Sequence, residues 1–155
     1  MRSRIRVYVV DESEFFRDVL QKFMSAAPDL IVAGETGSWD EAMVQVPEIR
    51  PQVVVIHATY AAPEASMPVL RFRKLYPSVR LIALVSRAAF RSDLGLWKAV
   101  ADHLVDRRTM DTGLLPAIRA EALSLSEASS DDTGALRLTT VDPKIWGNPP
   151  IYSYI

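Results

Sequence analysis

The stretch that decides the fold is Val-Val-Val-Ile-His at residues 53–57, an apolar run of mostly β-branched residues that ends in a histidine. A run without alternating polar residues predicts a central strand that is covered on both faces, as in parallel sheets. Four further apolar runs favour strands in the same way, at Ile5–Val10, Leu30–Ala33, Leu81–Val85 and Leu104–Val105. The sequence therefore predicts five strands.

Segments with helical periodicity follow the first two strands. Ser13 is placed to cap a helix whose apolar residues recur on one face, and Pro28 is expected to end it. Residues 38–41, Ser-Trp-Asp-Glu, have the spacing of a capping box and open a second, short helix. We expect Pro47 to close that helix, because proline cannot donate the backbone hydrogen bond of a helix interior.

Three more helices are predicted at Pro68–Leu75, Phe90–Val100 and Leu114–Leu125. The last should start near Gly113, because Pro116 fits only the first turn of a helix. Trp97, which lies at helical spacing in the fourth helix, is expected in the core.

Alternating strands and helices predict an α/β fold: a doubly wound, five-stranded parallel sheet of the flavodoxin-like type. The domain is expected over residues 4–125. Residues 126–155 are expected to form a linker rich in serine and aspartate, followed by an aromatic tail with Trp146, Tyr152 and Tyr154.

Composition excludes several classes of function. The chain has 155 residues, no cysteine and a formal net charge of −1. It therefore has no disulfide or thiolate metal site. It also lacks the excess of basic over acidic residues that is typical of a nucleic-acid-binding domain. Its apolar runs are too short for a membrane span, and we expect a cytoplasmic location and no membrane contact.

In an open parallel sheet, sites form beyond the carboxyl ends of the strands. The rule selects polar and flanking residues after the first, third, fourth and fifth strands, and predicts that they converge. These residues are Asp11, Glu12, His57, Val85, Ser86 and Arg107.

Several short segments, in their order and spacing, resemble the receiver domain of bacterial response regulators, of the CheY-like superfamily and its NarL/FixJ-like branch. They include Val-Val-Asp-Glu-Ser at 9–13, Phe-Arg-Asp-Val-Leu at 16–20 and Ala-Pro-Asp-Leu-Ile-Val-Ala-Gly-Glu at 27–35. Arg-Pro-Gln-Val-Val-Val-Ile at 50–56 and Leu-Tyr-Pro-Ser-Val-Arg-Leu-Ile-Ala-Leu at 75–84 continue the series.

The resemblance implies phosphoryl transfer to an aspartate beside a divalent cation, and this chain departs from that pattern. Asp11 and Glu12 match the family's acidic pair, but His57 falls where the acceptor aspartate should be. Val85 replaces the family's Thr or Ser, and Arg107 replaces its lysine. Leu104 occupies the position of the aromatic switch residue.

Without a carboxylate at position 57 no acyl phosphate can form. The resemblance therefore implies a pseudo-receiver that signals by protein–protein contact, with no enzymatic reaction and no cofactor. Asp11 and Glu12 remain only weak candidates for a cation, because the family's third carboxylate is missing. The expected partner is a protein, including a second copy bound through the face of residues 90–100, 104–105 and 114–125.

Other interpretations stay open at this point. His57 could sense pH, since its protonation would mimic a bound cation, or the acidic pocket could bind a small ligand. The chain could be the regulatory half of a NarL/FixJ-like transcription factor, although alone it should not bind DNA. A metal-dependent enzyme would use Asp11, Glu12 and His57, and Trp39 is a candidate interface anchor beside the aromatic tail.

Overall fold

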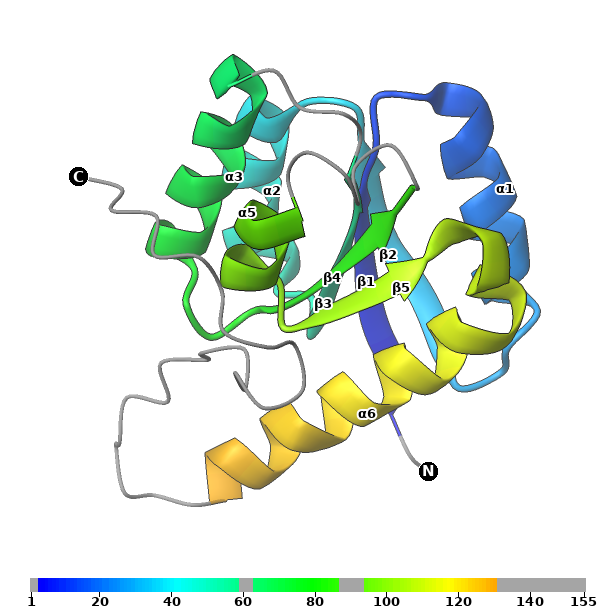
Figure 1. The fold of residues 1–155 in the computed structure, drawn as a ribbon. Coiled ribbons are helices and arrows are strands. Elements are labelled where there is room, and N and C mark those ends of the chain that lie inside the picture. Colours follow the sequence, from blue (N-terminus) through cyan, green and yellow to red (C-terminus); the bar gives the residue numbers. More distant parts are fainter. Residues whose placement is uncertain (1–2, 59–62, 87–93, 131–155) are drawn as a thin grey trace.

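A parallel sheet of five strands forms the centre of the molecule (Figure 1). The computed structural model describes residues 3–58, 63–86 and 94–130. The strand order is β2-β1-β3-β4-β5, which confirms the doubly wound α/β prediction. The strands are β1 Ile5–Val10, β2 Leu30–Thr36, β3 Val53–Ala58, β4 Arg80–Val85 and β5 His103–Asp106.

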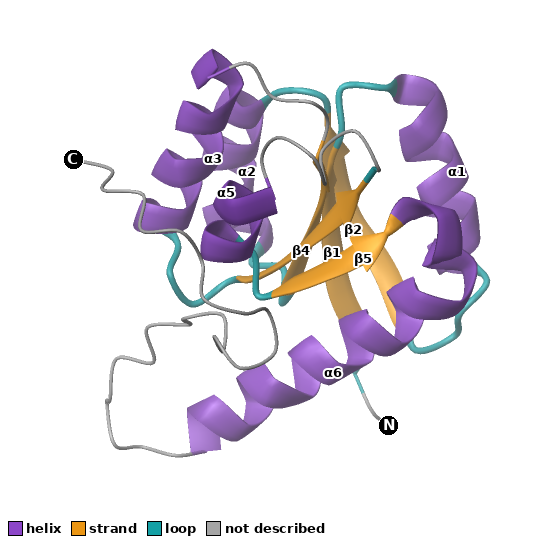
Figure 2. Ribbon diagram, viewed as in Figure 1, coloured by secondary structure: helices purple, strands orange, loops and turns teal. Residues whose placement is uncertain are grey.

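Helices cover both faces of this sheet (Figure 2). Residues of α1 and α6 pack in one core cluster, and residues of α2, α3 and α5 pack in the other. A short 3₁₀ turn at Arg107–Thr109 joins β5 to the last helix. The helices are α1 Glu14–Ser25, α2 Trp39–Ile49, α3 Pro63–Leu75, α5 Leu94–Val100 and α6 Met110–Ser130.

The central strand β3 divides its side chains between the two cores. Val53 and Val55 face α1 and α6, whereas Val54 and Ile56 face α2, α3 and α5, and all four are fully buried. Successive strand residues point to opposite faces, so His57 continues the series of Val53 and Val55 toward α1. The run that decides the fold thus also aims the histidine.

The predicted cap residues begin their helices. The Ser13 hydroxyl accepts a hydrogen bond from the Phe16 N–H at 3.2 Å, and Ser38 accepts one from Glu41 at 3.4 Å. These bonds satisfy backbone donors that a helix N-terminus leaves without partners.

The prediction that Pro47 closes α2 is wrong, because the helix continues to Ile49. A proline at this position deprives the Met43 carbonyl of its usual helical donor. The Tyr76 hydroxyl supplies that hydrogen bond instead, at 2.7 Å. Arg50 caps the helix after Ile49, with a left-handed backbone of φ 53°.

The bounds of the later helices also differ from the prediction. Helix α3 begins at Pro63, and α6 begins at Met110 rather than near Gly113, with Pro116 inside it. Pro116 is exposed, so solvent can reach the side of the helix where the backbone bond is lost. The first residues of the predicted fourth helix lie outside the described residues.

Helix α6 runs to Ser130, so the first five residues of the expected linker are helical. The tail residues Trp146, Tyr152 and Tyr154 lie outside the described part of the chain. No helix among the described residues is long and apolar enough to cross a membrane.

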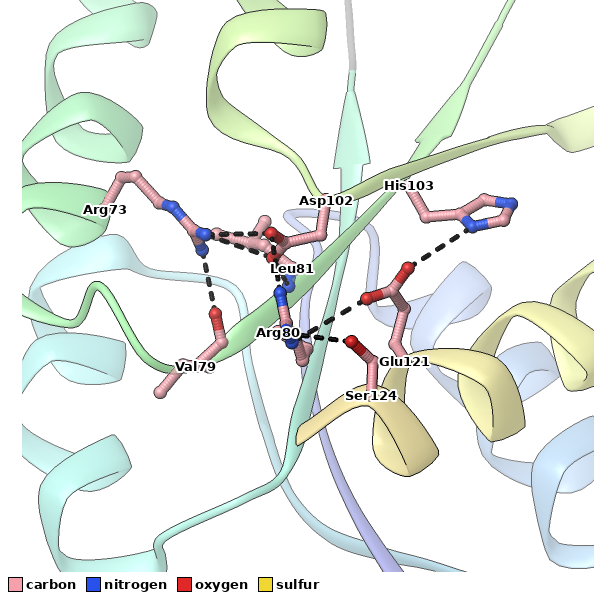
Figure 3. A network of polar contacts seen from close by, with 8 residues as sticks. All are labelled: Arg73, Val79, Arg80, Leu81, Asp102, His103, Glu121 and Ser124. Atoms are coloured by element: carbon pink, nitrogen blue, oxygen red, sulfur yellow. Dashed lines mark hydrogen bonds and ion pairs between the residues drawn. The ribbon is translucent and has the colours of Figure 1, made fainter. Parts of the chain in front are cut away.

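A polar network fixes the connection between α5 and β5 (Figure 3). The Asp102 carboxylate accepts two hydrogen bonds from Arg73, at 3.0 and 3.1 Å, and one from the Leu81 N–H at 2.8 Å. Arg80 donates to Asp102 at 3.3 Å and to Ser124 of α6 at 3.0 Å. Burial raises the pKa of the Asp102 carboxyl, against the opposing charge of Arg73. The network joins α3, β4, α6 and the residue before β5 at the end of the sheet opposite the predicted site.

Candidate functional site

Three of the predicted residues meet at the carboxyl edge of the sheet. Asp11 follows β1 directly, His57 is the fifth residue of β3, and Arg107 opens the 3₁₀ turn after β5. The side chain of Asp11 is 1% exposed and that of His57 is 8% exposed. The convergence expected from the topology is present for these three residues.

The His57 ring lies between a carboxylate and a guanidinium. Its Nδ1 is 3.2 Å from Asp11 Oδ2, and its Nε2 is 3.3 Å from Nη1 of Arg107. A guanidinium only donates hydrogen bonds, so in this contact Nε2 is the acceptor. The Nδ1 and Oδ2 atoms are close but not aligned as a hydrogen bond, and neither has another hydrogen-bond partner.

Phe16 of α1 completes this cluster. The Arg107 guanidinium carbon lies 4.1 Å from the centre of the Phe16 ring, a cation–π contact. The Phe16 and His57 rings are 5.0 Å apart at an angle of 37°. Helical periodicity after Ser13 puts Phe16 on the apolar face of α1 but does not predict this role. Its position three residues after the Ser13 cap was the available signal, since the first helical turn lies beside the end of β1.

Main-chain and side-chain contacts hold Asp11 in place. Its Oδ1 accepts a hydrogen bond from the Ser13 N–H at 2.8 Å, and its own N–H donates to the Thr36 carbonyl at 3.0 Å. Arg17 donates to the Asp11 carbonyl and lies 3.8 Å from Glu35. Asp11 is therefore a fixed acceptor whose second carboxylate oxygen faces His57.

The other predicted residues do not join the cluster. Glu12 is exposed, and Ser86 is half-buried. Val85 is fully buried and Leu104 is 9% exposed, and both pack in the core beneath α2, α3 and α5. Buried aliphatic side chains thus occupy the positions where the family carries a hydroxyl and an aromatic ring.

A cavity of about 130 Å³ opens beside the cluster. Trp97 lines it and is 4% exposed, which confirms its predicted place in the core. Trp39 is half-buried, with its ring 5.5 Å from that of Phe72, and its role as an interface anchor stays a prediction. The described lining residues are Val10, Asp11, Glu12, Gly37, Trp39, His57, Pro68 and Trp97.

The site does not fit the magnesium ion that the resemblance implies. Among the described residues, no three His, Asp or Glu side chains are placed to hold a metal ion. Mg²⁺ requires oxygen ligands in near-octahedral geometry, and an imidazole replaces one of the carboxylates.

Comparison with known proteins gives one consistent picture, although no protein-family model matches the chain. The DNA-binding transcriptional activator DevR/DosR of Mycobacterium tuberculosis is 44% identical over 52 residues, which are 34% of this chain and 24% of that protein. A protein-glutamate methylesterase/protein-glutamine glutaminase of Myxococcus xanthus is 32% identical over 109 residues, 69% of this chain and 31% of that protein. The chain therefore spans less than a third of the length of these relatives.

Solved structures match over nearly the whole described fold. The response regulator domain of Thermotoga maritima CheB is 25% identical, with a TM-score of 0.63 over 77% of this chain and 97% of that one. The signal receiver domain of the response regulator NarL from Mycobacterium tuberculosis has a TM-score of 0.62 and 18% identity, over 79% and 98% of the two chains.

Proposed function

Because the chain belongs to the response regulator receiver domains, we propose that it is a receiver-type regulator that works without phosphorylation, through contact with a protein partner. The methylesterase and DNA-binding activities in its relatives' names describe proteins more than three times as long as the matched segment.

The observation that carries the proposal is the imidazole of His57 at the acceptor position. Receiver chemistry needs a carboxylate that attacks phosphorus and a cation that neutralises the developing charge. A phosphorylated imidazole is not an easy replacement, because Nε2 accepts from Arg107 and Nδ1 lies 3.2 Å from the Asp11 carboxylate. Transfer to either nitrogen would break one of these contacts, and at Nδ1 it would place two anions side by side.

The residues that would report phosphorylation support the same conclusion. A receiver switch needs a hydroxyl that is drawn toward the phosphoryl group and a side chain that moves in response. Val85 has no hydroxyl and Leu104 is packed in the core. Arg107 is already held between Phe16 and His57. The domain would therefore present the same surface at all times. Its signalling would be regulated by how much of the partner protein is available.

The first surface to test is the face of α5, β5 and α6, with a second copy of the chain as partner. β5 is an edge strand, whose outer backbone groups have no strand neighbour among the described residues. The Asp102 network fixes the junction of α5 and β5 against α3 and α6, which gives this face a defined shape. Ala120 is exposed on α6.

Phosphorylation is tested by incubating the full chain with acetyl phosphate and Mg²⁺ and measuring its intact mass. We expect no phosphoryl adduct and no change in the NMR spectrum. A stoichiometric adduct on the wild-type chain that also alters the spectrum would refute the proposal. An unrelated receiver with its aspartate intact serves as the positive control.

Self-association is tested by size-exclusion chromatography with light scattering. Ala120→Glu should raise the dissociation constant of a dimer at least about tenfold, because a buried unpaired charge costs several kcal/mol at an interface. Val44→Glu introduces the same charge at an exposed position of α2 and should change nothing. A monomeric wild type, or equal effects of the two variants, would reject this face as the dimer interface.

A role as the regulatory part of a longer transcription factor stays a prediction. DevR/DosR is a DNA-binding activator, and the similarity covers 24% of it.

A further inference from the structure

The cavity beside His57 has a chemical character that regulation by protein contact does not use. At about 130 Å³ it is close to the size of an engineered cavity of about 150 Å³ that holds benzene, so it can take a ligand of about six non-hydrogen atoms. Two indole rings, Trp39 and Trp97, and two carboxylates, Asp11 and Glu12, contribute to its lining.

Three of the lining residues carry a buried polar atom without a hydrogen-bond partner. These atoms are Oδ2 of Asp11, Nδ1 of His57 and Nε1 of Trp97. Buried polar atoms in folded proteins are nearly always paired. Oδ2 of Asp11 and Nδ1 of His57 lie 3.2 Å apart without the alignment of a hydrogen bond, so Oδ2 and the Trp97 N–H are the atoms that a ligand in this cavity would pair with. Asp11 Oδ2 needs a donor, whereas the N–H of Trp97 needs an acceptor.

The charges around the cavity favour a cation. Asp11 and Glu12 line it, and among the described residues the nearby Arg17 and Arg107 have other partners. Arg107 binds the far nitrogen of His57 and stacks on Phe16, so it is not a lining residue. Arg17 donates to the main-chain carbonyl of Asp11, not to its carboxylate. Indole rings add a face that attracts cations, and tryptophan does this best among the aromatic residues.

We propose that this cavity binds a small primary ammonium compound that also carries an oxygen, a short amino alcohol being the simplest member of the class. The ammonium group donates to Asp11 Oδ2 and is attracted by Glu12. The ligand oxygen accepts from the Trp97 indole N–H, and its methylene groups lie against the indoles. The proposal rests on the cavity and its unpaired atoms, so it stands or falls separately from the phosphorylation test above.

The test uses ¹⁵N-labelled full-length chain and ethanolammonium chloride, with potassium chloride at the same ionic strength as the blank. The Trp97 indole N–H resonance, assigned by its loss in Trp97→Phe, should move downfield and saturate as it gains an acceptor. Asp11→Asn should weaken binding about tenfold or more, the loss expected for a hydrogen bond to a charged group. Asp18→Asn makes the same change at an exposed position of α1 and should bind like the wild type.

Two further measurements cover the alternatives. Glu12→Gln alters an exposed residue, so it keeps the fold even if Asp11→Asn does not, and it should also weaken binding. Tetramethylammonium has no N–H to donate and should bind more weakly than ethanolammonium. No saturable shift of the Trp97 resonance, equal binding of tetramethylammonium, or the same shift with Mg²⁺ alone would overturn the proposal.

Discussion

Replacing His57 with aspartate tests the geometry of the site directly. The new carboxylate would stand beside Asp11, where the imidazole Nδ1 now lies 3.2 Å from Oδ2. Two unit charges about 4 Å apart repel by about 4 kcal/mol at an effective dielectric constant of about 20. Arg107, which now contacts the imidazole, would offset part of this repulsion. We expect His57→Asp to lower the free energy of unfolding by about 2–3 kcal/mol in the absence of divalent cations.

Urea denaturation in EDTA and in Mg²⁺ measures this effect. The variant restores a third carboxylate, so Mg²⁺ should stabilise it, by about 2.7 kcal/mol at about a hundred times the Kd. The wild type should show no such dependence. His103→Asp is the control, because it places a carboxylate beside Glu121, which His103 now approaches at 3.5 Å, at a site without the acidic pair. Equal stability of His57→Asp and wild type in EDTA, or equal rescue of both histidine variants by Mg²⁺, would refute the reasoning.

Three other predictions concern stability and ionisation. Burial raises the pKa of Tyr8 to about 12 from 10, so the wild type should lose stability as the pH rises between these values, and Tyr8→Phe should abolish that loss in alkaline denaturation curves. Gly34→Ala would put a methyl group 2.8 Å from Ile49 Cδ1 and 2.9 Å from the Tyr8 ring, so urea denaturation should show a loss of about 1–3 kcal/mol. Hydrogen bonds from Arg119 lower the pKa of Asp29, so Arg119→Ala should raise that pKa in an NMR titration, while acid denaturation changes little because both side chains are exposed.

The sequence predicted the fold because its local signals agree with one another. The apolar runs place all five strands, and the two serine caps place the starts of α1 and α2. Helix ends were less predictable because they depend on contacts between distant residues. Pro47 indicates a helix end in the linear sequence, but Tyr76, far along the chain, supplies the hydrogen bond that lets α2 continue.

The site was predictable in part for the same reason. The rule for strand ends brings Asp11, His57 and Arg107 together. It does not say that Glu12 is exposed, or that Phe16 receives the Arg107 guanidinium. Those facts depend on the direction of each side chain where a strand gives way to a loop or helix, which no spacing in the sequence specifies.

The central position of β3 determines how fast the backbone amide of His57 exchanges with deuterium. Strand β3 pairs with β1 on one side and β4 on the other, and His57 is paired with Leu84, within the ladder rather than beyond it. Backbone amides in such a position exchange with deuterium only when a large part of the molecule opens, whereas the edge strands β2 and β5 can open alone. The imidazole is thus attached to a central strand, and its backbone should exchange more slowly than that of the edge strands.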